Sequence, residues 1–351
     1  MSEMFHEICQ ALLNRQELAV ATIISDRGST PRTSGSKMVV YPNSDISGTI
    51  GGGTVEGDVI QRALRLFETR GAEIVSYDLN RGANIDRLDL ICGGRIQILI
   101  EHMTVHEKNI DLFISAQEEM KNSRSFFWIG KITDVNGRLQ VEHAIQKADN
   151  DFIGPHHFEH EIQGLIEPGS RIFNGSCFIE NKGHSYVIES IRPPDTVFLF
   201  GAGHVSKEIA ALSEKVGFRI IVFDDRAEFA NADRFPNADK ILVCSGFTEV
   251  FHGFDTNPGD FIVIVTRGHR FDKKVLAQAL QTEAGYIGMI GSRKKRDTIY
   301  KELINQGFNQ STLEQVFCPI GLAIDAETPA EIGVSIVAQL IQHRAKRKNH
   351  E

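Results

Sequence analysis

The hydrophobic pattern at the start of the chain predicts two amphipathic helices among short strands. Apolar residues recur at helical spacing over 4–15 and again over 55–69. Short runs with the apolar, β-branched composition that is typical of strands lie at 18–25, 37–41, 74–78 and 96–101. The pattern therefore indicates a mixed arrangement of helices and strands in this part of the chain.

Residues from about 104 to 190 show a different pattern, which is typical of antiparallel hairpins. Apolar runs at 126–133 and 139–143 flank Asn136-Gly137, a dipeptide that favours a two-residue hairpin turn. A second hairpin is predicted over 171–180 and 184–189. We therefore expect this region to extend the first domain as an antiparallel sheet.

The segment Arg192-Pro193-Pro194-Asp195 predicts an extended connector, because proline disfavours helix at its own position and at the residue before it. Beyond it, continuous apolar strands are predicted at 197–201, 219–224, 241–244, 261–265 and 286–290. Helices are predicted between and after them at 204–215, 272–281, 293–306 and 328–344. Such alternation is typical of a parallel sheet whose two faces are both covered by helices.

The clearest motif is Phe200-Gly201-Ala202-Gly203-His204, which follows a predicted strand and begins a helix. Asp224 and Asp225 stand at the end of the next strand, which completes the layout of a dinucleotide-binding fold. Gly201 permits the tight turn, Gly203 lets the backbone approach a phosphate, and Asp224 is placed to accept hydrogen bonds from a ribose. Ser206 replaces the third glycine, so a scaffold whose glycines serve the turn alone is the alternative.

These patterns together predict an α/β protein of two domains. The C-terminal domain, 195–351, is expected to be a Rossmann-like, doubly wound parallel sheet. The N-terminal domain, 1–190, is expected to be a smaller, mixed α+β domain with antiparallel hairpins, whose hairpin region covers about 104–190.

Two further segments follow strands of the predicted parallel sheet and are expected to reach the same crevice. One is Thr266-Arg267-Gly268-His269, and the other runs from Gly291-Ser292-Arg293 into three more cations. Ligands of such sheets bind at the carboxyl ends of the strands. Four cations at a helix N-terminus oppose the helix dipole, and an anionic ligand would remove that conflict. A solvated basic turn is the alternative.

The N-terminal domain carries its own glycine-rich segment, with seven glycines between residues 26 and 57. Gly51-Gly52-Gly53 precedes a predicted helix, and such a run lets backbone amides face an anion. Arg32 and Lys37 would add positive charge, and Glu56 is a candidate acid–base group or helix cap. A Walker-type phosphate loop is excluded, because the required Lys-Ser/Thr pair is missing. Structural turns alone are the alternative reading of the glycines.

Cys92 is the candidate reactive thiol, because it lies beside Gly93-Gly94 and Arg95 could stabilise its thiolate. A small buried hydrophobe is the alternative. Cys9 and Cys244 are expected in the core and Cys177 in a hairpin. The histidine-rich segment 156–160 resembles a metal cluster, but no apolar framework surrounds it, so we do not expect a metal site there.

Composition and charge exclude several classes of function. The chain has 351 residues, and 38 basic against 46 acidic side chains give a net charge of −8. This balance disfavours nucleic acid or an acidic membrane surface as a partner. No apolar run approaches the ~18 residues of a membrane span, and no secretory leader is recognisable. Five scattered cysteines without a CxxC pair indicate reduced thiols, so we expect a cytoplasmic protein.

Six segments in this order resemble the XdhC/CoxI family, accessory proteins of xanthine dehydrogenases and related molybdenum hydroxylases. They are GSTPR with GSKMVV, GTIGGGTVEGDV, CGGRIQILIE, FLFGAGHVS with VFDDRAEF, GYIGMIGSRKKR and CPIGLAIDAETPAEI. The resemblance covers roughly 10–101 and 195–342 and leaves the middle hairpin region uncovered.

The resemblance implies a maturation role. Such proteins are thought to bind the molybdenum cofactor, as molybdopterin or a dinucleotide form, to assist exchange of an oxo for a sulfido ligand, and to deliver the cofactor to the hydroxylase apoenzyme. It further implies Cys92 as ligand of the molybdenum and as the catalytic residue, a cysteine desulfurase as a second partner, and NAD(P) or another nucleotide as an alternative ligand of the C-terminal domain. A homodimer is the expected assembly.

The residues expected to contact a cofactor are Ser29, Arg32, Gly51, Gly52, Gly53, Glu56, Gly93 and Gly94 in the first domain and Gly201, Gly203, His204, Asp224, Asp225, His269, Ser292 and Arg293 in the second. Two other functions stay open. One is an NAD(P)- or flavin-linked oxidoreductase, or a component of a xanthine dehydrogenase, with His269 as the acid of hydride transfer. The other is a docking module that binds no small ligand.

Overall fold

The computed structural model describes residues 2–79, 93–122, 124–147, 151–162, 166, 176–181 and 183–350. The chain divides into two compact units, Met1–Pro193 and Pro194–Glu351, which are described separately below. The N-terminal unit, expected to be the smaller, is the longer of the two. No helix in the described ranges is both long enough and apolar enough to cross a bilayer.

The N-terminal unit is built on a sheet whose described strand pairs are all antiparallel. Its strand order is β3-β2-β1-β5-β4-β7-β6-β10-β9, and β8 pairs with β7. The strands are β1 Leu18–Gly28, β2 Lys37–Val40, β3 Ile46–Gly48, β4 Ala72–Asp78, β5 Gly94–Met103, β6 Phe126–Val135, β7 Arg138–Lys147, β8 Phe152–Ile153, β9 Ser176–Asn181 and β10 His184–Ile191.

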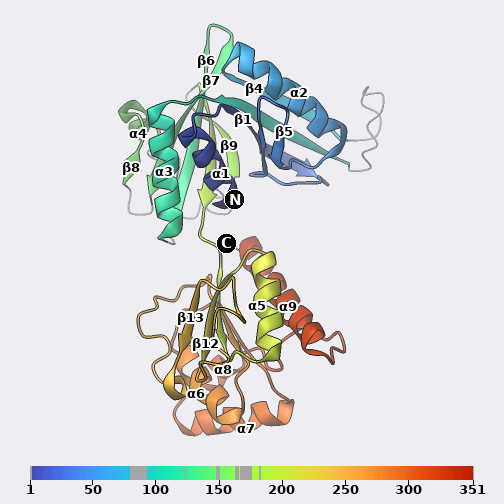
Figure 1. The fold of residues 1–351 in the computed structure, drawn as a ribbon, viewed down its shortest axis with the longest axis vertical. Helices are drawn as coiled ribbons and strands as arrows, with labels where there is room; N and C mark the ends of the chain where they lie inside the picture. The colour runs from blue at the N-terminus through green and yellow to red at the C-terminus, as the bar shows by residue number, and fades with distance from the viewer. Residues whose placement is uncertain are drawn as a thin grey trace. The chain divides into compact units, whose positions relative to one another are not determined.

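Helices cover the two faces of this sheet near strand β1 (Figure 1). Helices α1 (Ser2–Leu13) and α3 (Glu107–Lys121) pack against each other, and their side chains Phe5 and Phe113 contact Trp128 of the sheet. Helix α2 (Gly53–Thr69) covers the opposite face, where it buries Val59 against the sheet. Strand β1 is consequently buried on both faces over its first seven residues, which explains its continuous apolar sequence.

The predicted Asn-Gly hairpin is confirmed. Strands β6 and β7 pair in register from Val135↔Arg138 onward, and Asn136 and Gly137 have φ of 57° and 78°. These are the left-handed conformations that a type I′ turn requires at both central residues. Helix α3 was not predicted, because its buried residues are separated by charged ones and make a weak stripe. Helix α4 (His156–Ile162) was likewise not expected.

An ion pair lies inside the curl of this sheet. The Nζ atom of Lys37, on β2, lies 2.7 Å from Oε2 of Glu189, on β10, and both side chains are buried. Lys37 also donates a hydrogen bond of 2.9 Å to Oγ1 of Thr22. Nearby strands contribute a second buried pair, Glu101 with His143, at 2.7 Å. Lys37 therefore points into the unit, and the expectation that it adds charge to a phosphate site is wrong.

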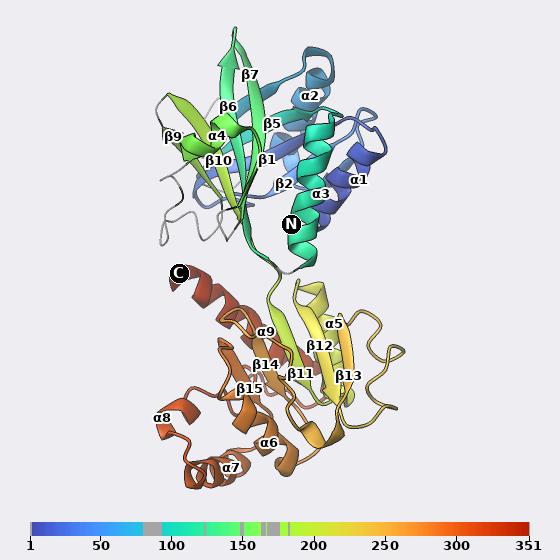
Figure 2. The same cartoon turned by 90° about the vertical axis from the view of Figure 1, so that its left-hand side faces the viewer.

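The C-terminal unit contains a parallel sheet with strand order β13-β12-β11-β14-β15. Helices α5 and α9 cover one face, and α6, α7 and α8 pack on the other (Figure 2). The elements are β11 Thr196–Phe200, α5 His204–Lys215, β12 Arg219–Asp224, β13 Lys240–Val243, η2 Ser245–Phe247, β14 Phe261–Ile264, α6 His269–Ala279, β15 Tyr286–Met289, α7 Arg293–Asn305, α8 Gln310–Leu313 and α9 Pro329–His350.

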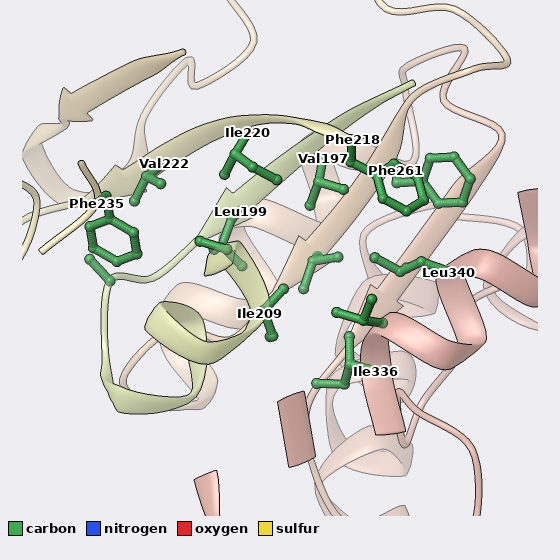
Figure 3. Close-up of a cluster of buried hydrophobic side chains, with 14 of the residues drawn as sticks. Val197, Leu199, Ile209, Phe218, Ile220, Val222, Phe235, Phe261, Ile336 and Leu340 are labelled. Carbon is green, nitrogen blue, oxygen red and sulfur yellow. The ribbon is translucent and has the colours of Figure 1, made fainter. Parts of the chain in front are cut away.

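Aliphatic and aromatic side chains fill the layer between this sheet and its helices. Figure 3 shows Leu199 of β11 above Ile209 of α5, with Val222 of β12 farther along the same layer and Ile336 and Leu340 of α9 on its other side. These five side chains are all buried, and the doubly wound fold that the sequence predicted is confirmed. Apart from η2, the single-turn helix α8 and the end of α9, which lies at His350 and not at the expected 344, each element was expected within a few residues of its observed bounds.

The buried Lys37–Glu189 pair generates a stability prediction. Replacement Glu189→Ala leaves a buried ammonium without its partner, so we expect the free energy of unfolding to fall by about 3–5 kcal/mol. The double variant Lys37→Met/Glu189→Leu should recover most of that loss. Urea denaturation followed by circular dichroism measures both.

The matched control is Arg95→Ala, which removes an ion pair with Asp78 from a side chain that is 71% exposed. It should cost less than ~1 kcal/mol. Equal losses in Glu189→Ala and Arg95→Ala would contradict the role given to the buried pair.

Candidate functional site

The residues predicted in the C-terminal domain meet at the carboxyl edge of its sheet. Strand β11 lies between β12 and β14, and the strand order reverses between β11 and β14. Three loops lie near this point: Gly201–Gly203 after β11, Asp225–Arg226 after β12, and Thr266–Gly268 after β14. This is the topological switch point at which doubly wound sheets bind their ligands.

The two glycines of the first loop have different physical roles. Gly201 has a φ of +106°, and a Cβ atom there would collide with the carbonyl oxygen of Val265. Gly203 has a φ of −74°, which any residue adopts, and a Cβ atom there would have no neighbour within 4 Å. The turn therefore requires Gly201, whereas neither conformation nor packing requires Gly203. The open space at Gly203 fits a ligand that approaches the backbone closely.

Helix α5 begins at this open space. Its N-cap is Gly203, and no side chain caps it by a hydrogen bond. An uncapped helix N-terminus, with its amides and the positive end of its dipole, favours a phosphate. Ser206, which replaces the third glycine, is 1% exposed in the first turn. A serine is therefore small enough for the close contact between helix and sheet at this position.

The carboxylate of Asp224 already accepts hydrogen bonds from the protein itself and is not available to a ribose. Its carboxylate accepts hydrogen bonds from the amide of Ala202 at 2.7 Å and from the amide and guanidinium of Arg226 at 2.9–3.1 Å. Burial would raise the pKa of Asp224, but these hydrogen bonds outweigh it and hold the pKa below its ordinary value. The carboxylate is only 2% exposed and fixes the glycine turn. The geometry thus disagrees with the expectation that Asp224 accepts hydrogen bonds from a ribose.

Asp225, the next residue, points across the crevice. Its Oδ2 atom lies 2.7 Å from Nη2 of Arg267, while its Oδ1 atom is buried and accepts no hydrogen bond from the described residues. His204 and His269 are exposed at the first positions of α5 and α6. Asp225 and Arg267, the latter outside the set of expected contact residues, are consequently joined by an ion pair across this crevice.

Two of the four cations at the start of α7 are paired with carboxylates of the protein itself. The hydroxyl of Ser292 accepts a hydrogen bond of 3.2 Å from the amide of Lys295, so Ser292 is the N-cap of this helix. Lys295 pairs with the buried carboxylate of Asp272, and Arg296 pairs with Asp297 at 2.7 Å. Arg293 is exposed. The protein thereby supplies much of the negative charge that an anionic ligand was expected to supply.

In the N-terminal unit, segments distant in sequence meet at one end of β1. Gly28 pairs with Gly94 across β1 and β5, and a Cβ atom at Gly94 would lie 2.6 Å from the carbonyl oxygen of Ser29. A Cβ atom at Gly51 would lie 3.1 Å from Cβ of Pro31. The loop that contains Ser29 and Arg32, the loop of Gly51, and Gly93-Gly94 are therefore neighbours, as a common site requires. Cys92 itself lies outside the described residues.

The amides of the Gly51–Gly53 loop are partly occupied. All three glycines have positive φ, of 128°, 76° and 68°. One carboxylate oxygen of Glu56 accepts hydrogen bonds from the hydroxyl of Thr49 at 2.6 Å, from the amide of Ile50 at 3.2 Å and from the amide of Gly52 at 3.1 Å. Glu56 thus occupies the position that was expected for a phosphate and holds the loop in shape. Ser29, Arg32 and Gly53 are exposed beside it.

The other thiols are poor candidates for metal binding. Burial raises the pKa of Cys9 and that of Cys244, and it raises the pKa of Cys177 and of Cys318 to about 11. These groups therefore stay protonated near neutral pH. Nor do the described residues contain a cluster of three or more potential metal ligands, and His157 instead lies 3.2 Å from Glu142.

The fold and the crevice define a two-domain protein with a Rossmann-type domain at its C-terminus. Residues 197–340 match the XdhC Rossmann domain, and residues 11–78 match the XdhC and CoxI family. The chain belongs to the XdhC and CoxI family.

Its relatives include proteins with and without a described function. The chain is 28% identical to a Bacillus subtilis protein described as a probable xanthine dehydrogenase subunit, over 97% of this chain and 98% of that protein. It is 24% identical to the uncharacterized protein YqeB of Escherichia coli, over 92% of this chain but 43% of that protein. A crystal structure described as a xanthine dehydrogenase from Bacillus halodurans superposes with a TM-score of 0.80 at 26% identity, over 98% of this chain and 96% of that one.

The different roles of Gly201 and Gly203 predict different effects when each is replaced by alanine. Gly201→Ala should lower the free energy of unfolding by about 1–3 kcal/mol, because alanine is strained at positive φ. Gly203→Ala should lower the free energy of unfolding by less than ~1 kcal/mol. Its methyl group should nevertheless fill the open space and weaken the binding of ADP, which serves as the probe for a nucleotide at this turn. Thermal unfolding and isothermal titration calorimetry measure the two effects. Unchanged ADP affinity in a folded Gly203→Ala protein would contradict a ligand over Gly203.

Proposed function

We propose that this protein binds the molybdenum cofactor and delivers it to a molybdenum hydroxylase of the xanthine dehydrogenase type. One observation carries the proposal: the loops of Ser29–Arg32, Gly51 and Gly93-Gly94 meet at one end of β1. Membership of the XdhC and CoxI family supports it. So do the descriptions of two relatives, a xanthine dehydrogenase structure and a probable xanthine dehydrogenase subunit.

The chemistry of these loops fits the proposed cargo. The cofactor is a pterin that carries an anionic phosphate and holds its metal through sulfur atoms. Arg32 is exposed beside Gly51 and offers a guanidinium for the phosphate. Cys92, adjacent in sequence to exposed Gly93, offers a soft thiolate for the metal. Because Glu56 holds the amides of Ile50 and Gly52, we assign the phosphate to Arg32 and not to those amides.

The Rossmann-type domain would hold a nucleotide in this proposal, either the nucleotide half of a dinucleotide cofactor or a separate NAD(P). The uncapped start of α5 and the open space at Gly203 support a phosphate there. The same observations favour the second candidate function, an NAD(P)-linked oxidoreductase. The homodimer and the cysteine desulfurase partner stay predictions.

Cofactor loading in cells tests the proposal. The full chain is purified from a host that makes molybdenum cofactor, and molybdenum is quantified by elemental analysis and pterin by the fluorescence of its oxidised form. We expect both in the wild-type protein, and a clear loss of bound molybdenum in Cys92→Ala, because a soft metal ligand is removed. Arg32→Ala should weaken pterin retention about tenfold through the lost charge-assisted hydrogen bond.

The matched control is Cys177→Ala, which removes a half-buried thiol from the same unit whose pKa of about 11 makes it a poor ligand. It should retain the cofactor. Equal retention in Cys92→Ala and wild type would contradict the role of Cys92. Oxidation of NAD(P)H by a preparation free of molybdenum would instead favour the oxidoreductase.

A further inference from the structure

The ion pair between Asp225 and Arg267 spans the crevice of the C-terminal unit. Asp225 follows β12 directly, and Arg267 lies in the loop after β14. Strand β11 lies between these two strands, so the pair crosses the carboxyl end of β11, where the Gly201–Gly203 turn leads into α5. A nucleotide seated at the switch point would meet this pair.

The two side chains of this pair differ in their exposure and in their other contacts. Arg267 is 54% exposed, and apart from Asp225 its guanidinium lies near the Phe271 ring, 5.9 Å from the ring centroid. Asp225 is 12% exposed, and its buried Oδ1 atom accepts no hydrogen bond from the described residues, although Nε of Arg226 lies 3.8 Å away. The neighbouring Asp224 is saturated by the amide of Ala202 and by Arg226. Of the two carboxylates at the end of β12, Asp225 is therefore the one whose oxygen atoms can accept further hydrogen bonds.

We propose that Asp225 and Arg267 recognise the nucleotide by exchanging partners. In the free protein they bind each other. On binding, Arg267 moves from Asp225 to a phosphate of the ligand, and the released Asp225 carboxylate accepts hydrogen bonds from the ribose hydroxyls. The inference rests on the proposal that this domain binds a nucleotide, and it assigns the ribose to Asp225 in place of the expected Asp224.

The energetics permit this exchange. Arg267 is the exposed member of the pair, so water solvates its guanidinium when it leaves Asp225, and opening the pair costs little. A guanidinium–phosphate contact is among the stronger charge-assisted hydrogen bonds and offsets that cost. The phosphate is not repelled by the acidic pair, because Arg226 neutralises Asp224, and Arg234 adds a further guanidinium that donates to the carbonyl oxygen of Ala202.

Two probes that differ only at the ribose test the inference. ADP and 2′,3′-dideoxy-ADP are titrated into the full chain by calorimetry at fixed ionic strength. Wild type should bind ADP about tenfold more tightly, because only ADP satisfies Asp225. Asp225→Ala should abolish that preference and should bind dideoxy-ADP no less tightly than wild type, because Arg267 is then free. Arg267→Gln should weaken both probes about tenfold and leave their ratio unchanged.

The controls are Asp233→Ala and Arg270→Gln, exposed side chains of the same two regions, which should leave both affinities unchanged. Thermal unfolding of each variant verifies the fold. A ribose preference that survives in Asp225→Ala overturns the inference, as does failure of wild type to bind either probe at millimolar concentration. If wild-type protein binds neither probe but still carries molybdenum and pterin, this inference fails while the proposed delivery function stands.

Discussion

The crevice of the C-terminal unit depends on one buried carboxylate. Asp224 ties the end of β12 to the turn after β11 through the amide of Ala202, and Arg226 neutralises its charge from the same loop. Because this carboxylate is held out of water, the turn has one conformation, with Gly201 at positive φ against the carbonyl oxygen of Val265. The open space at Gly203 and the position of Asp225 both follow from that conformation.

Both glycine-rich segments use an internal carboxylate in the same way. Glu56 accepts hydrogen bonds from the amides of Ile50 and Gly52, and Asp224 accepts one from the amide of Ala202. Glycine-rich loops are well suited to bind anions, and in both of these loops a carboxylate of the protein itself accepts hydrogen bonds from the loop amides. Such a side chain preforms the loop, and it leaves the exposed cations Arg32 and Arg267 for a phosphate.

The sequence predicted the C-terminal unit well, because its strands are continuous apolar runs between helices, and α5 and β12 were predicted with their observed bounds. Helix α3 was missed, since tertiary packing around Phe113 compensates for a weak apolar stripe. At the site, the sequence placed Gly201, Gly203 and both aspartates correctly along the chain. It could not show which aspartate has its hydrogen bonds already made, because that depends on the rotamer of Arg226 and on the amide of Ala202 in the turn after β11.

The Lys37–Glu189 pair joins strands far apart both in sequence and in the order of the sheet. A chain that ends before β10 would lose the counter-ion of Lys37 and the strand that carries it. The stretch 11–78, although it matches the family by itself, lacks Glu189 and also β5, the strand that lies between β1 and β4. The N-terminal unit is complete only when its final strand has paired. Because Lys37 and Glu189 are far apart in sequence, we expect this pairing to slow the folding of the unit.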